Sequence, residues 1–417
     1  MANNNENKVL NVPNLRFPEF TGEWKKIKVS ELLDFYSTNS LSWEQLDYSN
    51  GKIKNLHYGL IHKGVPTMVD VACDALPYIK EESMPKSFTI FKEGDVTFAD
   101  ASEDTNDVAK AIEVINCDNQ QIVSGLHTIH GRDNSEQTVI GYKGYAFASD
   151  SFHKQIRRIA QGTKVFSIST RNFDEVYIGI PSKEEQTKIA KLLIAIDKRI
   201  ATQNKIIEDL KKLKSAISHS LLLRSDLLEK RILLSEIGIL KNGYAFQSSS
   251  YDCTGMYEVL TISNVTGGRY ISTDGCNRIR TKPVDIQSHQ ELKINDILIS
   301  LTGNVGRVSL CREGLYLLNQ RVGLLQLDSD VNREFIYQVL SSRSFEQSMI
   351  SCSQGAAQMN IGKGDVESYR IPYSGNPLNL LKIALILNSY DSKILIEEQT
   401  LQLLNIQRKY LLTTLFI

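Results

Sequence analysis

The stretch IAKLLIAIDKRIATQNKIIEDLKKLKSAISHSL occupies residues 189–221 and carries apolar side chains at alternating steps of four and three. A second stretch, IALILNSYDSKILIEEQTLQLLNIQRKYLLTTL at residues 383–415, repeats this spacing near the end of the sequence. Apolar residues at this spacing form a stripe along an α-helix and are typical of a coiled coil. We therefore expect two long helices with seams formed by Ile189, Leu193, Ile196, Ile200, Ile207, Leu210, Ile217 and Leu221, and by Ile383, Leu387, Ile394, Leu401, Leu404, Leu411 and Leu415.

Polar side chains interrupt both stripes at the same two steps. Gln203 and Lys214 stand in the first stripe, and Glu397 and Arg408 stand at the matching steps of the second. These residues could fix the register of an antiparallel pair, or their long stems could simply extend to solvent. A helix over residues 185–222 would be about 57 Å long at 1.5 Å per residue, so one small domain could not cover its seam. The pattern predicts that the two helices pair antiparallel.

The segments between the helices also repeat, at a spacing of roughly 200 residues. Residues 26–31 (KIKVSE) resemble residues 231–236 (RILLSE), and residues 92–96 (KEGDV) resemble residues 293–297 (KINDI). Both segments alternate short apolar runs with glycine and asparagine turns, which is typical of strands. We expect an α+β protein with two mixed α/β modules. The predicted order is an N-terminal tail (1–22), module 1 (23–182), a central spacer helix (183–225), module 2 (226–373) and a C-terminal spacer helix (374–417).

Composition excludes several classes of protein. The chain has 417 residues and 48 basic residues against 48 acidic ones, so a nucleic-acid site would need local clustering of charge. Its six cysteines form no C-x-x-C pair, which argues against a zinc site or a disulfide framework. No apolar run is long enough for a membrane span and the start has no signal-peptide layout, so we expect a cytoplasmic protein.

Catalytic motifs are missing from both halves of the sequence. There is no phosphate-binding P-loop, no H-E-x-x-H metal motif and no G-x-S-x-G nucleophile elbow. The sequence also lacks the Asn-Pro-Pro-aromatic box of enzymes that methylate exocyclic amines. We expect a protein that is not an enzyme, with no metal and no cofactor of its own.

Base-capable side chains lie on turn-rich segments at matching places in the two modules. Arginine can bind guanine through two hydrogen bonds in the major groove, and asparagine or glutamine can do the same for adenine. Each of these residues could equally be a turn residue that bonds to its own backbone. The candidates are Asn55, His57, Tyr58 and His127 in module 1, and Tyr244, Phe246, Asn264, Thr302, Asn304, Arg307, Asn319, Gln320 and Arg321 in module 2.

Basic residues cluster between positions 143 and 171, where six stand against a single acid. A local charge of about +5 is enough for several phosphate contacts. The plainer interpretation is a solvated basic face. We predict DNA-phosphate contacts from Lys143, Lys154, Arg157 and Arg158.

Three further stretches resemble one protein family. Residues 13–20 (PNLRFPEF), followed by Trp24, are similar to the usual start of the specificity subunits of type I restriction–modification systems. Residues 240–249 (LKNGYAFQSS) with 262–265 (ISNV) resemble the entry of their recognition domains, and residues 180–186 (IPSKEEQ) resemble the box that opens their central helix. The second helix departs from this pattern, because residues 371–378 (IPYSGNPL) lack the Glu-Gln found at 185–186.

The resemblance implies that the two modules are target-recognition domains, each reading one half of a bipartite site in double-stranded DNA. It implies two modification subunits that methylate adenine with S-adenosylmethionine, and restriction subunits that need ATP and Mg. The missing Glu-Gln makes docking of the second modification subunit less secure. Two alternatives stay open: a self-sufficient nuclease or methyltransferase, which the missing motifs disfavour, and a coiled-coil adaptor that reads no bases.

Overall fold

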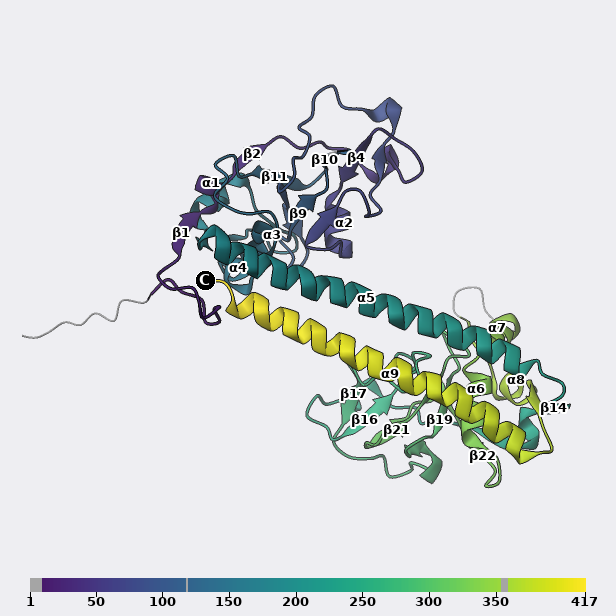
Figure 1. Ribbon diagram of the computed structural model, residues 1–417. Helices are drawn as coiled ribbons and strands as arrows, with labels where there is room; N and C mark the ends of the chain where they lie inside the picture. Colours follow the sequence, from purple (N-terminus) through teal and green to yellow (C-terminus); the bar gives the residue numbers. More distant parts are fainter. Residues whose placement is uncertain (1–9, 118, 354–358) are drawn as a thin grey trace, which may run out of the picture. The chain divides into compact units, whose positions relative to one another are not determined.

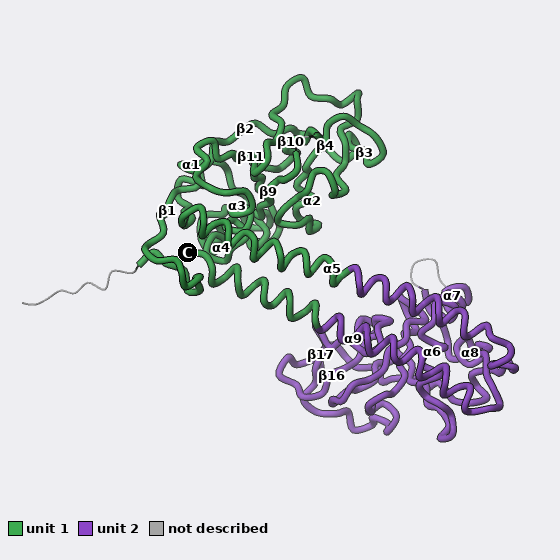
Figure 2. The backbone as a smooth tube through the Cα atoms, in the orientation of Figure 1, with its two compact units in different colours: residues 1–204, 400–417 green, residues 205–399 purple. Residues whose placement is uncertain are grey.

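The computed structural model describes residues 10–117, 119–353 and 359–417. Contacts divide the chain into two compact units, residues 1–204 with 400–417 and residues 205–399 (Figure 2). Two long helices, α5 (Lys183–Leu222) and α9 (Pro377–Thr414), each contribute one segment to both units (Figure 1). Among the described residues no helix is long and apolar enough to cross a membrane.

Module 1, in the first unit, is built around two sheets. A five-stranded sheet has the order β2-β11-β7-β9-β5, and a four-stranded sheet has the order β10-β4-β6-β3. The first comprises β2 (Asp34–Tyr36), β11 (Thr128–Arg132), β7 (Val96–Ala99), β9 (Ala111–Ile115) and β5 (Met68–Asp70). The second comprises β10 (Gln121–Ser124), β4 (Ile53–Leu56), β6 (Tyr78–Ile79) and β3 (Leu46–Asp47). The remaining elements are β1 (Lys25–Lys28), β8 (Ala101–Ser102), β12 (Phe166–Ser167), β13 (Tyr177–Ile180), α1 (Val29–Leu32), α2 (Tyr58–Lys63), α3 (Tyr142–Phe147) and α4 (Asp150–Ile159).

Module 2, in the second unit, is likewise built around two sheets, each of four strands. Their strand orders are β15-β22-β19-β20 and β17-β16-β21-β18. These strands are β15 (Gly238–Asn242), β22 (Val322–Leu327), β19 (Ile297–Ser300), β20 (Val308–Leu310), β17 (Asn277–Ile279), β16 (Tyr257–Leu260), β21 (Tyr316–Leu318) and β18 (Glu291–Leu292). The remaining elements are β14 (Lys230–Leu233), β23 (Arg370–Tyr373), α6 (Arg333–Leu340), α7 (Arg343–Cys352) and α8 (Lys363–Glu367).

The two modules share a common core of strand pairings, as the sequence repeat predicts, although the sheet around β11 has five strands and the sheet around β22 has four. In module 1, β4 runs parallel to β10, and β11 pairs antiparallel with both β2 and β7. In module 2, β16 runs parallel to β21, and β22 pairs antiparallel with both β15 and β19. The predicted fold class, two mixed α/β modules with two long helices, is therefore correct.

Matching local signals begin equivalent helices. Ser149 caps α4 by accepting a hydrogen bond from the backbone N–H of Phe152, and Ser342 caps α7 in the same way from Phe345. Serine is a favoured N-cap because its oxygen satisfies one of the free N–H groups of the first turn. Both phenylalanine side chains are fully buried, so cap and core fix the start of each helix together.

The predicted seam residues pack inward along both helices. In the first unit Ile189 and Leu193 of α5 and Leu411 of α9 lie in one core cluster with module 1. In the second unit Ile383 and Leu387 of α9 lie in the core of module 2, with Ile217 of α5 packed against it. The seam of each helix is therefore shared between its partner helix and a module.

The basic interruptions of the seams form ion pairs between the helices. Nε of Arg408 lies 2.5 Å from Oδ1 of Asp197 in the first unit, and Nζ of Lys214 lies 2.6 Å from Oδ1 of Asp391 in the second. Asp197 follows the seam residue Ile189 by eight positions, and Asp391 follows Ile383 by eight. The two pairs thus occupy equivalent places in the repeat. This arrangement favours a role in register over extension of the side chains to solvent.

The Glu-Gln box, Glu185 and Gln186, forms buried hydrogen bonds within the first unit. Glu185 is buried and accepts hydrogen bonds from Nε of Arg16 at 2.7 Å and from Nε1 of Trp24 at 3.2 Å. Gln186 is also buried and accepts from the backbone N–H of Val139 at 2.8 Å. Both side chains therefore make their contacts within their own unit.

Candidate nucleic-acid interface

Three connections meet at one edge of each module, and we call this the three-loop edge. In module 1 it comprises the β10–β11 turn and the residues that follow β4 and β7. In module 2 it comprises the β21–β22 turn and the residues that follow β16 and β19. One backbone hydrogen bond joins the turn to the parallel strand: Gly125 N–H to Leu56 O at 3.0 Å, and Asn319 N–H to Leu260 O at 3.1 Å.

A second backbone bond joins the turn to the end of the central strand. The N–H of Asp100 donates to the carbonyl of His127 at 3.1 Å, and the N–H of Leu301 donates to that of Arg321 at 3.1 Å. His127 and Arg321 therefore stand at the same place in the two modules. These hydrogen bonds identify the matching residues of the two turns.

The module 2 candidates divide into exposed and occupied side chains. Asn304, Gln320 and Arg321 are exposed, and the Arg307 side chain is 38% exposed with its Nε 3.7 Å from a carboxylate oxygen of Glu346. A loose pair of this kind leaves the guanidinium free to form other contacts. Gln320, Arg321, Asn304 and Arg307 are thus the module 2 candidates that could reach a ligand.

The other module 2 candidates are held by the fold. Asn264 is buried and accepts from the backbone N–H of Thr261 at 2.7 Å, which makes it a turn residue. Thr302 and Asn319 are buried in the edge itself. Tyr244 donates its hydroxyl to Asp285 at 2.9 Å, and its ring centroid lies 4.9 Å from that of Phe246.

In module 1 the candidates divide in the same way. Asn55 is fully buried and donates to Oδ1 of Asn39 at 3.0 Å. His57 is buried and caps α2 by accepting from the N–H of Gly59 at 3.1 Å, and burial lowers the pKa of its imidazole. Tyr58 is partly exposed, and the His127 side chain is 52% exposed. Only Tyr58 and His127 of this group present side chains to solvent.

Two residues beside the three-loop edge of module 1, Trp43 and Lys63, were not predicted from the sequence. The Trp43 ring lies 4.5 Å from that of His57, and Nζ of Lys63 lies 5.2 Å from the Trp43 ring centroid. Trp43 is 38% exposed. A tryptophan in a turn-rich segment could have been chosen from the sequence as a candidate contact residue. Its position next to His57 is known only from the fold. Together these side chains form an aromatic row with a cation at one end.

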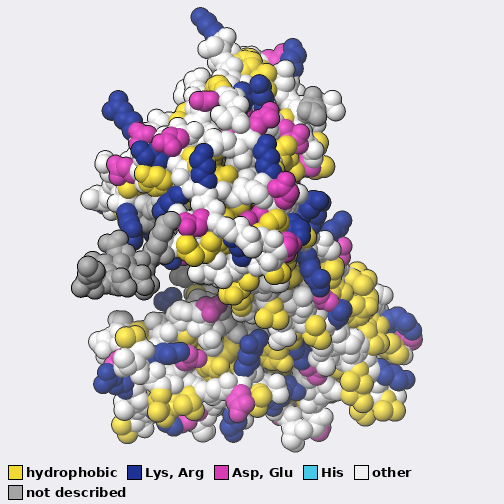
Figure 3. All heavy atoms as spheres, turned by 60° about the vertical axis from the view of Figure 1, so that its left-hand side comes forward, with side chains coloured by type: hydrophobic (Ala, Val, Ile, Leu, Met, Phe, Trp, Pro, Cys, Tyr) yellow, Lys and Arg dark blue, Asp and Glu magenta, His cyan; other side chains and the backbone are white. Residues whose placement is uncertain are grey.

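The predicted basic cluster is not a single patch. Lys143 is buried, and its Nζ lies 3.5 Å from Oε1 of Glu113. Its charge is therefore paired inside module 1 and does not face solvent. Asp150 pairs with Lys154 at 2.7 Å and with Arg157 at 3.6 Å, while Arg158 is exposed. Figure 3 shows basic and acidic side chains interspersed on the face that it presents. The geometry favours the solvated-face interpretation for most of this cluster.

Glu113 explains why Lys143 is drawn inward. Its carboxylate accepts hydrogen bonds from the backbone N–H groups of Gly141 at 2.9 Å and Gly144 at 2.7 Å, at the start of α3. Complete burial raises the pKa of the Glu113 carboxyl. A buried carboxylate needs a partner, and Lys143 supplies it.

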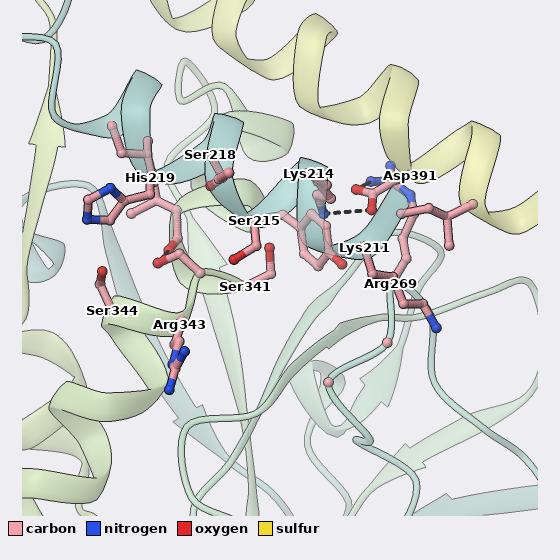
Figure 4. A pocket seen from close by; sticks show the side chains of 18 of the residues that line it. Lys211, Lys214, Ser215, Ser218, His219, Arg269, Ser341, Arg343, Ser344 and Asp391 are labelled. Carbon is pink, nitrogen blue, oxygen red and sulfur yellow. Dashed lines mark hydrogen bonds and ion pairs between the residues drawn. The ribbon is translucent and has the colours of Figure 1, made fainter. Parts of the chain in front are cut away.

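A cleft of about 1110 Å³ opens in the second unit between α5, α9 and module 2. Figure 4 shows Lys214 of α5 beside Asp391 of α9, with Arg269 of module 2 close to both. Arg269 pairs with Asp391 at 2.9 Å and with Glu334 at 2.8 Å. These cations are paired with acids, so the residues on this wall of the cleft stabilise the packing of the helices on module 2. Within the described part of the chain, no group of three or more His, Cys, Asp or Glu side chains could hold a metal ion.

Comparison with known proteins gives this arrangement a family. The model of the type I restriction modification DNA specificity domain matches residues 21–212 and again residues 230–405. The chain belongs to this family. Each match takes in one module of the chain, in agreement with the internal repeat.

Two curated relatives extend the comparison. The chain is 25% identical over 234 residues to the type I restriction enzyme MjaVIII specificity subunit of Methanocaldococcus jannaschii, covering 51% of this chain and 55% of that protein. It is 25% identical over 317 residues to a putative type I restriction enzyme MjaX specificity subunit of the same organism, covering 70% of each. The chain thus spans little more than half the length of the first relative.

A solved structure shares the fold. The crystal structure of a type I restriction–modification S subunit from M. genitalium matches with a TM-score of 0.57 at 17% identity, covering 97% of this chain and 99% of that one. At this identity the likeness concerns the fold alone.

Proposed function

We propose that the chain is the DNA-specificity subunit of a type I restriction–modification complex, in which each module reads one half of a bipartite target. The observation that carries this proposal is the three-loop edge. It recurs in both modules with the same backbone bonds, and it presents different polar side chains, His127 in one module and Arg321 in the other. A shared frame with variable contact residues is what two recognition sites of different sequence preference require.

The chemistry is proposed to reside on partner subunits. We infer two modification subunits that methylate adenine with S-adenosylmethionine, and restriction subunits that use ATP and Mg to translocate and cleave. The missing catalytic motifs support a non-catalytic role for this chain. The chain itself is proposed to bind double-stranded DNA. The expected compartment is the cytoplasm.

The paired helices are proposed to set the gap between the half-sites. Helix α5 has 40 residues, about 60 Å at 1.5 Å per residue. This length is compatible with half-sites that lie at least one DNA turn apart, about 34–36 Å. The expectation that the second modification subunit docks less securely came from the absence of Glu-Gln in residues 371–378. Since Glu185 and Gln186 are buried and bonded within their own unit, we propose that two copies dock.

A genome-wide map of N6-methyladenine, with and without this gene, tests the proposal. One split motif with an unspecified gap should vanish when the gene is deleted. If methylation is unchanged while the protein and active modification subunits are present, the proposal is wrong.

Arginine variants separate base reading from a purely structural adaptor. Arg307→Ala and Arg321→Ala should each cost about 1–3 kcal/mol of discrimination and relax the motif at defined positions. Arg370→Ala is the matched control, because this exposed arginine lies on β23 outside the three-loop edge. An adaptor that reads no bases would leave the motif unchanged in all three variants.

A further inference from the structure

The β10–β11 turn holds His127 in a defined position. Its φ is +53°, in the left-handed region that few side chains adopt. The neighbouring Gly125 lies so close to β4 that a Cβ atom there would come within 2.3 Å of Oδ1 of Asn55. The backbone bond from Asp100 N–H to His127 O completes the frame. The positive φ, the close approach and the hydrogen bond together define the backbone from which the His127 side chain extends.

Asp100 lies beside one of the two ring nitrogens of His127. Oδ1 of Asp100 lies 3.3 Å from Nδ1 of His127, and this oxygen is buried with no hydrogen-bond partner among the described residues. A carboxylate beside Nδ1 favours the tautomer with the proton on Nδ1, which leaves Nε2 as an acceptor in the neutral ring. The Tyr58 ring lies edge to face with the His127 ring, at 5.2 Å between centroids. No hydrogen bond to Nε2 is found among the described residues.

Arg321, at the same place in module 2, offers the opposite chemistry. Its guanidinium has only donors, and two of them match O6 and N7 of guanine. Exocyclic amino groups, N4 of cytosine and N6 of adenine, are the donors that a major groove presents. An acceptor at the position of His127 can pair only with these amino groups.

We propose that His127 is a specificity-determining residue of module 1 and that, through Nε2, it accepts a hydrogen bond from the exocyclic amino group of an adenine or a cytosine. Asp100 acts as the positioning residue that fixes the tautomer. Module 2 reads a guanine at the equivalent place with Arg321. This inference rests on the proposed function, and it adds which chemical group each module selects.

The first test is a methylation map for variants of the full chain in its native host. His127→Gly removes the imidazole and tolerates the positive φ, so it leaves the turn intact. It should lower the ratio of matched to mismatched methylation roughly tenfold at one position of one half-site, and leave the other half-site unchanged. Arg321→Ala should relax one position of the other half-site. His127→Arg should replace an amino-bearing base by guanine at the affected position.

The second test identifies the amino group directly. DNA carrying purine in place of adenine, or 2-pyrimidinone in place of cytosine, lacks only the exocyclic amine at the relaxed position. This change should weaken binding of the purified complex with wild-type chain roughly tenfold and have no further effect with His127→Gly. Asp100→Ala should reduce the preference for the amine, because the imidazole can then adopt either tautomer.

Failure of this inference differs from failure of the proposed function. If gene deletion removes a split motif but His127→Gly leaves both half-sites unchanged, His127 reads no base and only the inference is overturned. An equal loss with and without the amine would overturn the acceptor role. If deletion itself leaves methylation unchanged, the proposed function is wrong. Circular dichroism of each variant shows whether the fold is retained, and the amine test is carried out on variants that keep it.

Discussion

At the scale of single residues, His153 makes module 1 sensitive to acid. Burial is the main cause that lowers the pKa of this imidazole to about 4, and its Nδ1 is buried without a partner among the described residues. An ordinary histidine in an unfolded chain titrates near 6.5. The unfolded state therefore binds more protons between pH 6.5 and 4, so this contribution to stability is lost as the pH falls through that window.

His153→Leu should remove this part of the acid sensitivity. We expect the wild-type chain to lose up to about 3 kcal/mol from this group between pH 7 and pH 4, and the variant to show a shallower fall. Urea unfolding followed by circular dichroism at several pH values measures the difference. His219→Leu, on the exposed end of α5, is the matched control and should keep the wild-type slope. Equal slopes for wild type and His153→Leu would contradict the assignment.

At the scale of elements, the aspartate of an interhelical ion pair can accept hydrogen bonds from more residues than its basic partner alone. Asp391 accepts from Lys214 at 2.6 Å, from Arg269 at 2.9 Å and from Gln338 at 2.7 Å. Removing a buried acid with several partners leaves uncompensated charge, which costs about 3–5 kcal/mol. Asp391→Ala should therefore destabilise the second unit by about that amount, whereas Lys214→Met should cost only about 1 kcal/mol.

The equivalent pair in the first unit provides a test of register. Asp197 accepts from Arg408 at 2.5 Å and from the hydroxyl of Tyr145 at 2.9 Å. Each of Asp197→Arg and Arg408→Asp should lower the thermal stability, and the double swap should recover part of the loss. A double-mutant cycle gives the coupling, expected at about 1–3 kcal/mol. Additive losses would show that this pair does not couple the two helices.

At the scale of the whole molecule, the proposed function makes helix length a measurable quantity. One heptad inserted after residue 203 in α5, and another after residue 399 in α9, keeps both seams in phase. Seven residues add about 10.5 Å of helix, which corresponds to about three base pairs. We expect the unspecified gap of the methylation motif to grow by about three base pairs while both half-sites stay the same.

Controls make this experiment specific to length. A four-residue insertion in α5 alone shifts the seam out of phase and should abolish methylation rather than lengthen the gap. An unchanged gap after the paired heptad insertions would show that the helices do not set the spacing between half-sites.

The sequence predicted what depends on periodicity and repetition. The heptad spacing from Ile189 and from Ile383 is visible without coordinates because a buried stripe requires apolar residues at fixed steps. The duplicated KEGDV and KINDI segments likewise predicted equivalent turns, and in both the aspartate side chain accepts from the N–H of the lysine three residues earlier at 2.8 Å.

Side-chain accessibility could be decided only by the tertiary structure. Lys143 and Asn55 have the residue types of DNA contacts, yet Glu113 and Asn39 engage them in the fold. Those partners stand 30 and 16 positions away, at separations that follow no period. Local pattern therefore determines which elements form and that they occur twice. Long-range packing determines which polar side chains are consumed by the protein and which, such as His127 and Arg321, stay exposed for a partner.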